Sequence, residues 1–129
     1  MGSRYYVKKV AEFLDPEGNF FDSRLIARED FKEKSKKNLD LVLGQECGTI
    51  IVDDTKSVWS DRLDNLITVE KYYYFTDRHQ NCKSHVEMKT DEIESEGELR
   101  NVLEVLRRIH RLFFDGLIKD VRCLPFKIF

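Results

Sequence analysis

The chain has 129 residues, which suits one domain that buries about two-thirds of the surface of its unfolded state. Its 24 acidic and 22 basic residues nearly cancel, so the overall charge gives no reason to expect a nucleic acid or an anionic membrane as partner. No apolar stretch approaches the ~20 residues of a membrane span, and the N-terminus lacks the layout of a signal peptide, so we expect a soluble intracellular protein.

The first 48 residues predict helix, strand and helix in turn. A short first helix is predicted by apolar residues at helical spacing before Pro16 and Gly18, namely Tyr6, Val10, Phe13 and Leu14. Residues 20–27 are rich in aromatic and aliphatic side chains and are a plausible strand. A second helix is predicted through Leu39, Val42 and Leu43, closing at a left-handed Gly44.

The rest of the chain predicts two strands and one long helix. Residues 49–52 are a continuous apolar or β-branched run, typical of a parallel strand covered on both faces, and residues 66–69 are a second such run. Residues 79–91 are polar and fit a surface loop. Ser95 and Glu98 match a capping box, and the helix after them has an apolar face that we expect to pack on its own domain rather than on a partner: Leu99, Val102, Leu103, Leu106, Ile109, Leu112 and Phe113.

Two adjacent carboxylates, Asp53 and Asp54, directly follow the first apolar run. In open α/β sheets ligands bind outside the carboxyl ends of the strands. Two anions this close repel each other, so a chemical role requires water, a cation or a positive side chain in the same place, and Mg²⁺ and lysine are the obvious candidates. The alternative is structural, because aspartate often opens an Asx-turn or caps a helix.

Several other features have a structural interpretation that we prefer. His79, Cys82 and His85 have a spacing that could ligate zinc, but a fourth ligand is not evident. The aromatic run at residues 72–75 could stack on bases, yet packing in the core or at a sheet edge is the simpler explanation. The basic run at residues 32–37 could contact a phosphorylated peptide, but for all of it except Lys37 a solvated helix entrance is the simpler explanation. Cys47 is not favoured as a nucleophile, because a cysteine nucleophile needs a base and no histidine is nearby in sequence. The odd number of cysteines, Cys47, Cys82 and Cys123, favours free thiols.

Most of the chain resembles a known family, the phosphatase domain of RNA polymerase II C-terminal-domain phosphatases in the haloacid dehalogenase superfamily, and most closely its plant phosphatase-like branch. The resemblance is co-linear up to about residue 115. It rests on the segments at residues 1–6, 11–16, 25–30, 37–46, 52–55 with Trp59, 64–67 and 109–114. We therefore expect residues 1–115 to be the C-terminal part of such a domain and residues 116–129 to be a divergent tail.

The resemblance implies roles for three residues. Lys37 matches the family lysine, which would offset the charge of phosphoryl oxygens and restrain the nearby acids. Asp53 and Asp54 match the acidic pair of the metal site, where one would reach Mg²⁺ directly or through water and the other would orient Lys37. The partner implied is the phosphorylated repeat peptide of RNA polymerase II, in the nucleus, without direct contact to nucleic acid or membrane.

The chain departs from the family where the chemistry begins. The family nucleophile lies in a D-x-D-x-[TV] motif, and these 129 residues contain no D-x-D. We therefore expect a partial haloacid-dehalogenase-like three-layer α/β sandwich without its first strand, as in a shortened gene product. Such a chain would be inactive, because covalent catalysis needs the attacking carboxylate. It could close its exposed sheet edge by forming a homodimer. The alternative function is a non-catalytic fragment that binds phosphopeptide or protein.

Overall fold

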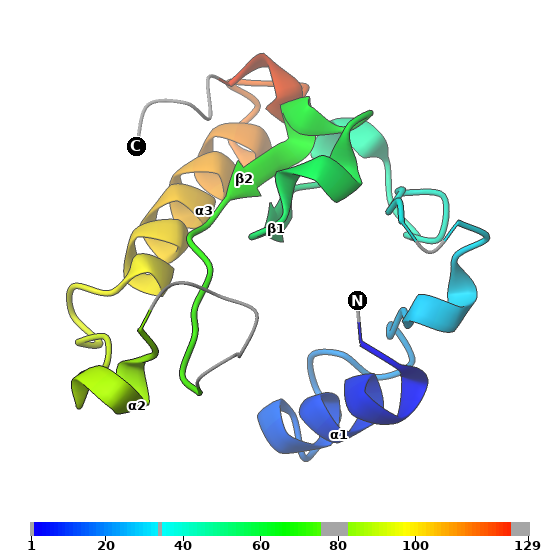
Figure 1. Ribbon diagram of the computed structural model, residues 1–129. Helices are drawn as coiled ribbons and strands as arrows, with labels where there is room; N and C mark the ends of the chain where they lie inside the picture. The colour runs from blue at the N-terminus through cyan, green and yellow to red at the C-terminus, as the bar shows by residue number, and fades with distance from the viewer. Residues whose placement is uncertain (1, 34, 76–82, 125–129) are drawn as a thin grey trace. The chain divides into compact units, whose positions relative to one another are not determined.

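The computed structural model describes residues 2–33, 35–75 and 83–124, and the chain forms two compact units (Figure 1). The first unit comprises Met1–Leu43 with Ser57–Asp61, and the second comprises Gly44–Lys56 with Arg62–Phe129. Within the described residues no helix has the length and apolar character needed to cross a bilayer.

Helix α1 (Arg4–Leu14) organises the first unit, as the spacing of its apolar residues predicts. Ser3 caps it, with its Oγ accepting a hydrogen bond from the backbone N–H of Tyr6. The guanidinium of Arg4 pairs with Asp30 in the 3-10 helix Arg28–Asp30, and Asp30 also accepts the N–H of Ala27 at 2.8 Å. These contacts fix the N-terminal end of α1 against a segment about 25 residues further along the chain.

The strand predicted at residues 20–27 is wrong, because a carboxylate takes the amides that a sheet would use. Asp15 is buried, and its two oxygens accept the N–H groups of Asn19, Phe20 and Phe21 at 2.9, 2.7 and 2.8 Å. The Arg24 side chain donates to the carbonyl oxygen of Phe20 at 2.5 Å. With donors and acceptors already paired locally, the segment forms turns instead of a strand.

The helix predicted at residues 39–43 is also wrong. Only one turn forms there, with the N–H of Val42 donating to the carbonyl of Leu39 at 2.9 Å, and Leu43 is fully exposed. So short a helix needs an apolar face to bury, and this segment buries little. Gly44 does not provide the left-handed cap, since the glycines with positive φ in the described chain are Gly18 and Gly116.

The second unit contains a small parallel sheet made of β1 (Ile51–Asp53) and β2 (Leu66–Thr68). Ile51 pairs with Leu66, Val52 with Ile67 and Asp53 with Thr68. Both apolar runs therefore form strands as predicted, and their parallel pairing is confirmed. Short 3-10 helices precede each strand, at Glu46–Gly48 and Leu63–Asn65, and another at Lys56–Trp59 begins the connection between them.

Two helices follow the sheet, and they use the capping signals differently from the prediction. The one-turn helix α2 (His85–Met88) lies in the segment expected to be a loop, and it has the capping box: Ser84 Oγ accepts the N–H of Glu87, and Glu87 Oε2 accepts the N–H of Ser84 at 2.9 Å. Helix α3 (Glu98–Phe114) starts after Gly97 with no side-chain cap. The capping box predicted at Ser95 and Glu98 is therefore wrong, because Glu98 is itself the first helical residue.

The core of the second unit lies between β2, α3 and the segment that follows α3 (Figure 1). Its buried cluster is Ile67, Val105, Ile109 and Val121, with Ile118 and Leu124 packed against it. The apolar face of α3 thus packs on its own unit, as expected. Two residues differ from the predicted face: Leu99 is 72% exposed, and Val105, which was not predicted, is buried. Val121 is only 2% exposed, so the C-terminal segment belongs to this core. A tail boundary at residue 116 stays a prediction.

Candidate functional site

The carboxyl ends of β1 and β2 lie together, because the strands are parallel and in register. Asp53 is the last residue of β1, and its register partner is Thr68, the last residue of β2. The ladder continues one step further, with the N–H of Val69 donating to the carbonyl of Asp53 at 3.2 Å. The acidic pair therefore stands at the sheet edge where α/β proteins place their ligands.

Asp53 and Asp54 form a tight bend around Thr55. Asp53 Oδ1 accepts the backbone N–H of Thr55 at 2.8 Å, and Asp54 Oδ1 accepts the Thr55 hydroxyl at 2.5 Å. Asp53 is half-buried and Asp54 is exposed. The Asx-turn expected by the structural interpretation is thus present. It also holds each carboxylate in a fixed orientation at the strand end, which a ligand site requires.

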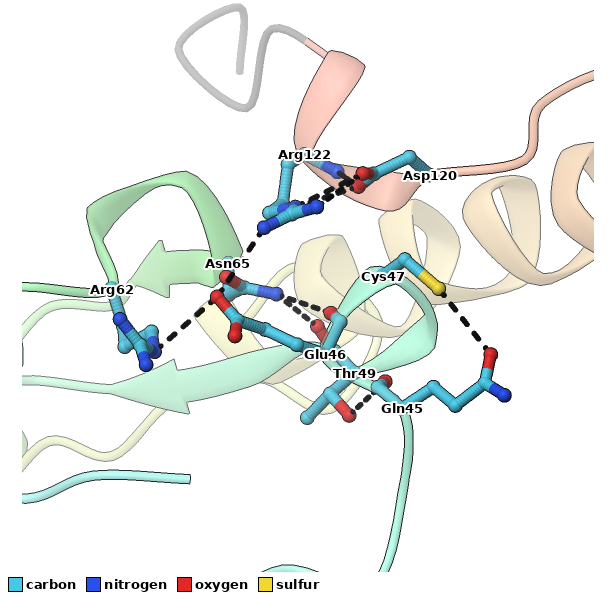
Figure 2. Close-up of polar contacts among 8 residues, drawn as sticks. All are labelled: Gln45, Glu46, Cys47, Thr49, Arg62, Asn65, Asp120 and Arg122. Carbon is cyan, nitrogen blue, oxygen red and sulfur yellow. Dashed lines mark hydrogen bonds and ion pairs between the residues drawn. The ribbon is translucent and has the colours of Figure 1, made fainter. Parts of the chain in front are cut away.

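A buried amide fixes the other end of the same two strands (Figure 2). Asn65, immediately before β2, is 1% exposed, and its Nδ2 donates to the carbonyl oxygens of Glu46 and Thr49 at 2.8 and 2.9 Å. Both carbonyls belong to the segment that leads into β1. Asn65 thereby joins the N-terminal ends of the two strands through a side chain.

The Glu46 carboxylate lies between two arginines, as Figure 2 shows. Its Oε1 is 3.3 Å from Arg62 Nε and 3.3 Å from Arg122 Nη1. Asp120 accepts Arg122 Nη2 at 2.6 Å, and this hydrogen bond lowers the pKa of the Asp120 carboxyl. Through these pairs the segment after α3 contacts the start of β1, so residues near the C-terminus help to set the position of the strand that bears the acids.

Lys37 lies in the first unit, whereas the acidic pair lies in the second. Its Nζ is 5.7 Å from the centroid of the Trp59 ring, a cation–π distance, and its N–H donates to the carbonyl of Val58 at 2.8 Å. Trp59 is buried, and it belongs to the segment that follows Asp53 and Asp54 along the chain. Lys37 is thus anchored on that segment, and its interaction with the acids stays a prediction.

Asp53 and Asp54 can be compared with what a magnesium site requires. Among the described residues no three His, Cys, Asp or Glu side chains come together as a metal site would require. Mg²⁺, however, keeps several waters and is often held by one or two carboxylates together with substrate phosphates. Two carboxylates with fixed orientations fit that donor set, so Asp53 and Asp54 are suitable for Mg²⁺ when a phosphate supplies further oxygens.

The other candidate residues have local roles. His79 and Cys82 lie outside the described residues, and the ring of His85 stacks on Tyr72 with centroids 4.7 Å apart. The aromatic run is not in the core, since Tyr72 is 48% and Phe75 75% exposed. The thiol of Cys47 contacts Gln45 Oε1 at 3.6 Å, and both described cysteines are free.

Comparison with known proteins identifies the class of protein to which these elements belong. The sequence matches the family model of NLI interacting factor-like phosphatases over residues 1–116, so the chain belongs to that family.

Relatives with known names point to one branch of the family. RNA polymerase II C-terminal domain phosphatase-like 4 of Arabidopsis thaliana is 42% identical over 125 residues, which are 94% of this chain and 28% of the relative. Phosphatase-like 3 of the same plant is 34% identical over 132 residues, covering 93% of this chain and 11% of the relative. A human RNA polymerase II C-terminal domain phosphatase is 40% identical over 77 residues, 57% of this chain and 8% of that protein.

The fold has a counterpart among solved structures. A fission yeast RNA polymerase II CTD phosphatase, an Fcp1 variant bound to beryllium fluoride, superposes with a TM-score of 0.69 at 22% identity and covers 89% of this chain and 42% of that chain. The chain thus shares the fold of the matching part of that phosphatase, here with a small parallel sheet and helices. The chain spans little more than a quarter of the length of its plant relative, phosphatase-like 4.

Proposed function

We propose that the chain forms the lysine and metal-binding side of a phosphate site of the RNA polymerase II C-terminal-domain phosphatase type. The observation that supports it most strongly is the family match over residues 1–116 combined with an oriented acid pair at the carboxyl end of a parallel sheet. The proposed substrate class is a phosphoserine or phosphothreonine peptide. The proposed place of action is the nucleus, because the relatives are named for RNA polymerase II, which works there.

In this proposal each residue has a separate task at the phosphate. Lys37 contributes a fixed positive charge that offsets the charge of the phosphoryl oxygens. Asp53 and Asp54 would hold Mg²⁺, and the Thr55 contacts orient their carboxylates. When bound, Mg²⁺ supplies charge neutralisation and orients the phosphoryl group.

The 129-residue chain by itself is proposed to be inactive. Its sequence contains no D-x-D, and the family reaction begins with attack of an aspartate on phosphorus. The residues present bind and orient a phosphate, which is the part of the reaction that does not require the nucleophile. This favours the second candidate function, a module that binds a phosphopeptide without hydrolysing it.

Hydrolysis of p-nitrophenyl phosphate by the purified chain, with and without Mg²⁺, tests the proposed inactivity. We expect no turnover above the buffer blank. Asp53→Asn is the test variant, and Asp64→Asn is the matched control, because Asp64 is an exposed acid at the opposite end of β2. Turnover that Asp53→Asn abolishes and Asp64→Asn retains would overturn the proposed inactivity and show that hydrolysis requires the Asp53 carboxylate.

Magnesium binding is tested separately from activity. NMR titration with Mg²⁺ is expected to shift the amide signal of Thr55, which donates to Asp53, and added inorganic phosphate should strengthen the binding. Asp53→Asn should remove the shift and Asp64→Asn should leave it. A Thr55 signal unmoved by Mg²⁺ with phosphate present would refute the metal assignment.

The proposal includes a homodimer. Within the described residues the sheet has only β1 and β2, and Val52 is 41% exposed. An unpaired strand edge favours association with a second copy. Sedimentation equilibrium of the chain should give the dimer mass, and Val52→Lys should give the monomer mass. A wild-type monomer at concentrations above roughly 100 micromolar, where even weak association is detected, would contradict the dimer.

A further inference from the structure

A hollow between β2 and α3 is separate from the acidic pair and has not been assigned a role. Its volume is about 700 Å³. Its apolar lining comes from Ile67, Val102 and Val105, and Thr68, the last residue of β2, also lines it. Binding sites for small ligands fall in this size range.

The polar lining of the hollow carries both signs of charge, with arginine in excess. Arg107, Arg108 and Arg111 line it, together with the acids Glu98 and Glu104. Glu104 forms ion pairs with two arginines, since its Oε1 is 3.0 Å from Arg107 Nη1 and 3.5 Å from Arg100 Nη2. In contrast, Arg108 and Arg111 form no ion pair with any described residue. These two guanidinium groups are therefore the candidates for binding an anion at the hollow.

The hollow lies near the proposed phosphate site. Thr68, which lines it, is the register partner of Asp53, and neighbouring strands are about 4.8 Å apart. The carboxyl end of β2 therefore lies between the hollow and the acids at the end of β1. A flexible ligand held at one position can reach the other.

We propose that this hollow binds the second phosphate of a multiply phosphorylated peptide, one of whose phosphates occupies the site at Asp53 and Asp54. Arg108 and Arg111 bind the second phosphate, since a guanidinium presents paired donors that match phosphate oxygens. The apolar floor receives a side chain between the two phosphates. The inference rests on the proposed function and adds to it a preference for peptides with more than one phosphate.

Charge favours a peptide over a nucleic acid or a membrane. Three arginines against two glutamates give the lining an excess of one positive charge, which favours a single anionic group over a run of them. The segment just before α3 carries four acids in six residues, Asp91, Glu92, Glu94 and Glu96. An extended polyanion laid along this surface would meet those negative charges, whereas a short peptide with a single anionic group at the hollow avoids them.

Fluorescence anisotropy tests the preference directly. The probes are two-repeat peptides from the RNA polymerase II C-terminal domain that carry one or two phosphoserines, titrated with the whole chain in the presence of Mg²⁺. We expect the doubly phosphorylated peptide to bind roughly tenfold more tightly than the singly phosphorylated one, on the scale of two exposed charge pairs. In the Arg108→Gln, Arg111→Gln double variant this preference should fall to about twofold, the statistical factor for two phosphates.

Two control variants separate the inference from the function on which it rests. Arg100→Gln removes an exposed arginine of the same helix that does not line the hollow, so the preference should be retained. Asp53→Asn should weaken both peptides by a similar factor. Anionic vesicles containing phosphatidylserine and single-stranded RNA are titrated in parallel, and neither should bind in a manner that depends on Arg108 and Arg111.

The outcomes are distinguishable. If the singly phosphorylated peptide binds and needs Asp53 but a second phosphate adds nothing, the hollow is not a phosphate site and the proposed function stands. A preference that survives in the double variant, or that Arg100→Gln removes equally, overturns the assignment of Arg108 and Arg111. If neither peptide binds, both proposals fail. Arginine-dependent binding of vesicles or RNA without peptide binding replaces the peptide with that partner.

Discussion

Asn65 provides the sharpest test of how the sheet is held together. Its Nδ2 donates two hydrogen bonds, to the carbonyls of Glu46 and Thr49, and the residue is 1% exposed. Asn65→Ala removes both bonds and leaves two acceptors in a site that water reaches poorly. A typical buried hydrogen bond contributes about 1 kcal/mol net, and a buried polar group left without a hydrogen-bond partner costs about 1–3 kcal/mol. We therefore expect a loss of about 2–4 kcal/mol in the free energy of unfolding.

Urea denaturation followed by circular dichroism at 222 nm measures this loss, since α3 dominates the helical signal of the second unit. The matched control is Asn38→Ala, which removes an exposed amide whose Nδ2 donates to Asp40 at 2.9 Å. The control should change the free energy by less than about 0.5 kcal/mol. If Asn65→Ala is as mild as the control, the amide bridge does not hold the strands and the reasoning fails.

The variant Asn65→Asp adds a pH signature. A carboxylate at this position would face two carbonyl oxygens, so its charged form is disfavoured and its pKa in the folded state is raised above the unfolded value. The variant should be closest to wild type below the unfolded pKa, where the protonated acid still donates one bond. Its stability should fall as the pH rises through the folded pKa. A penalty independent of pH would refute this account.

Three further predictions concern other contacts. Ser84→Ala should cost about 1 kcal/mol through loss of the capping box, whereas Ser95→Ala, at the unused motif, should cost almost nothing in urea denaturation. The hydrogen bond to Asp91 raises the pKa of Tyr72 to about 12, so the stabilising effect of this bond is present below pH ~10 and is lost as the pH rises toward that value. Absorbance titration at 295 nm should show one tyrosine with this raised pKa, and Asp91→Asn should return that pKa toward the usual value. The pKa of Asp15 is lowered mainly by the hydrogen bond from the backbone N–H of Phe21; burial opposes this shift, and the N–H groups of Phe20 and Asn19 add to it. The ionised Asp15 carboxylate therefore stabilises the fold above its unfolded pKa, and this stabilisation is lost as the pH falls through the folded pKa. Asp15→Asn should abolish this acid sensitivity in carboxyl NMR titration and acid unfolding.

Elements with a long or continuous apolar signal could be predicted from the sequence. Helix α3 has an apolar face over 17 residues, and both strands are continuous apolar or β-branched runs, so their type follows from local pattern alone. The predictions from sequence fail where the hydrogen bonds of one side chain determine the local structure. Asp15 takes the amides of residues 19–21 and prevents a strand, and nothing in the aromatic composition of residues 20–27 signals that contact.

The two S-x-x-E motifs show the same limit. Ser84 and Glu87 form a capping box, whereas Ser95 and Glu98 do not, although the spacing is identical. The site was predictable in part, because an acid pair after an apolar strand can be recognised locally. Asn65 could not be found in this way, since its acceptors are 16 and 19 residues away and asparagine before a strand usually indicates a turn.

The register that Asn65 helps to fix decides which acid faces inward. Side chains alternate along a strand, so Asp53 lies on the face of Ile51, which is 6% exposed, whereas Val52 lies on the opposite face and is 41% exposed. Asp54 follows β1 in a bend and is exposed. A slip of one residue would exchange these faces and turn Asp53 toward the face of Val52. Since β1 has only three residues, its ladder alone specifies the register weakly. The amide of Asn65 at one end and the Asp53 to Thr55 contact at the other supply the remaining constraint, so the chemistry proposed for the acids depends on a side chain at the opposite end of the strand.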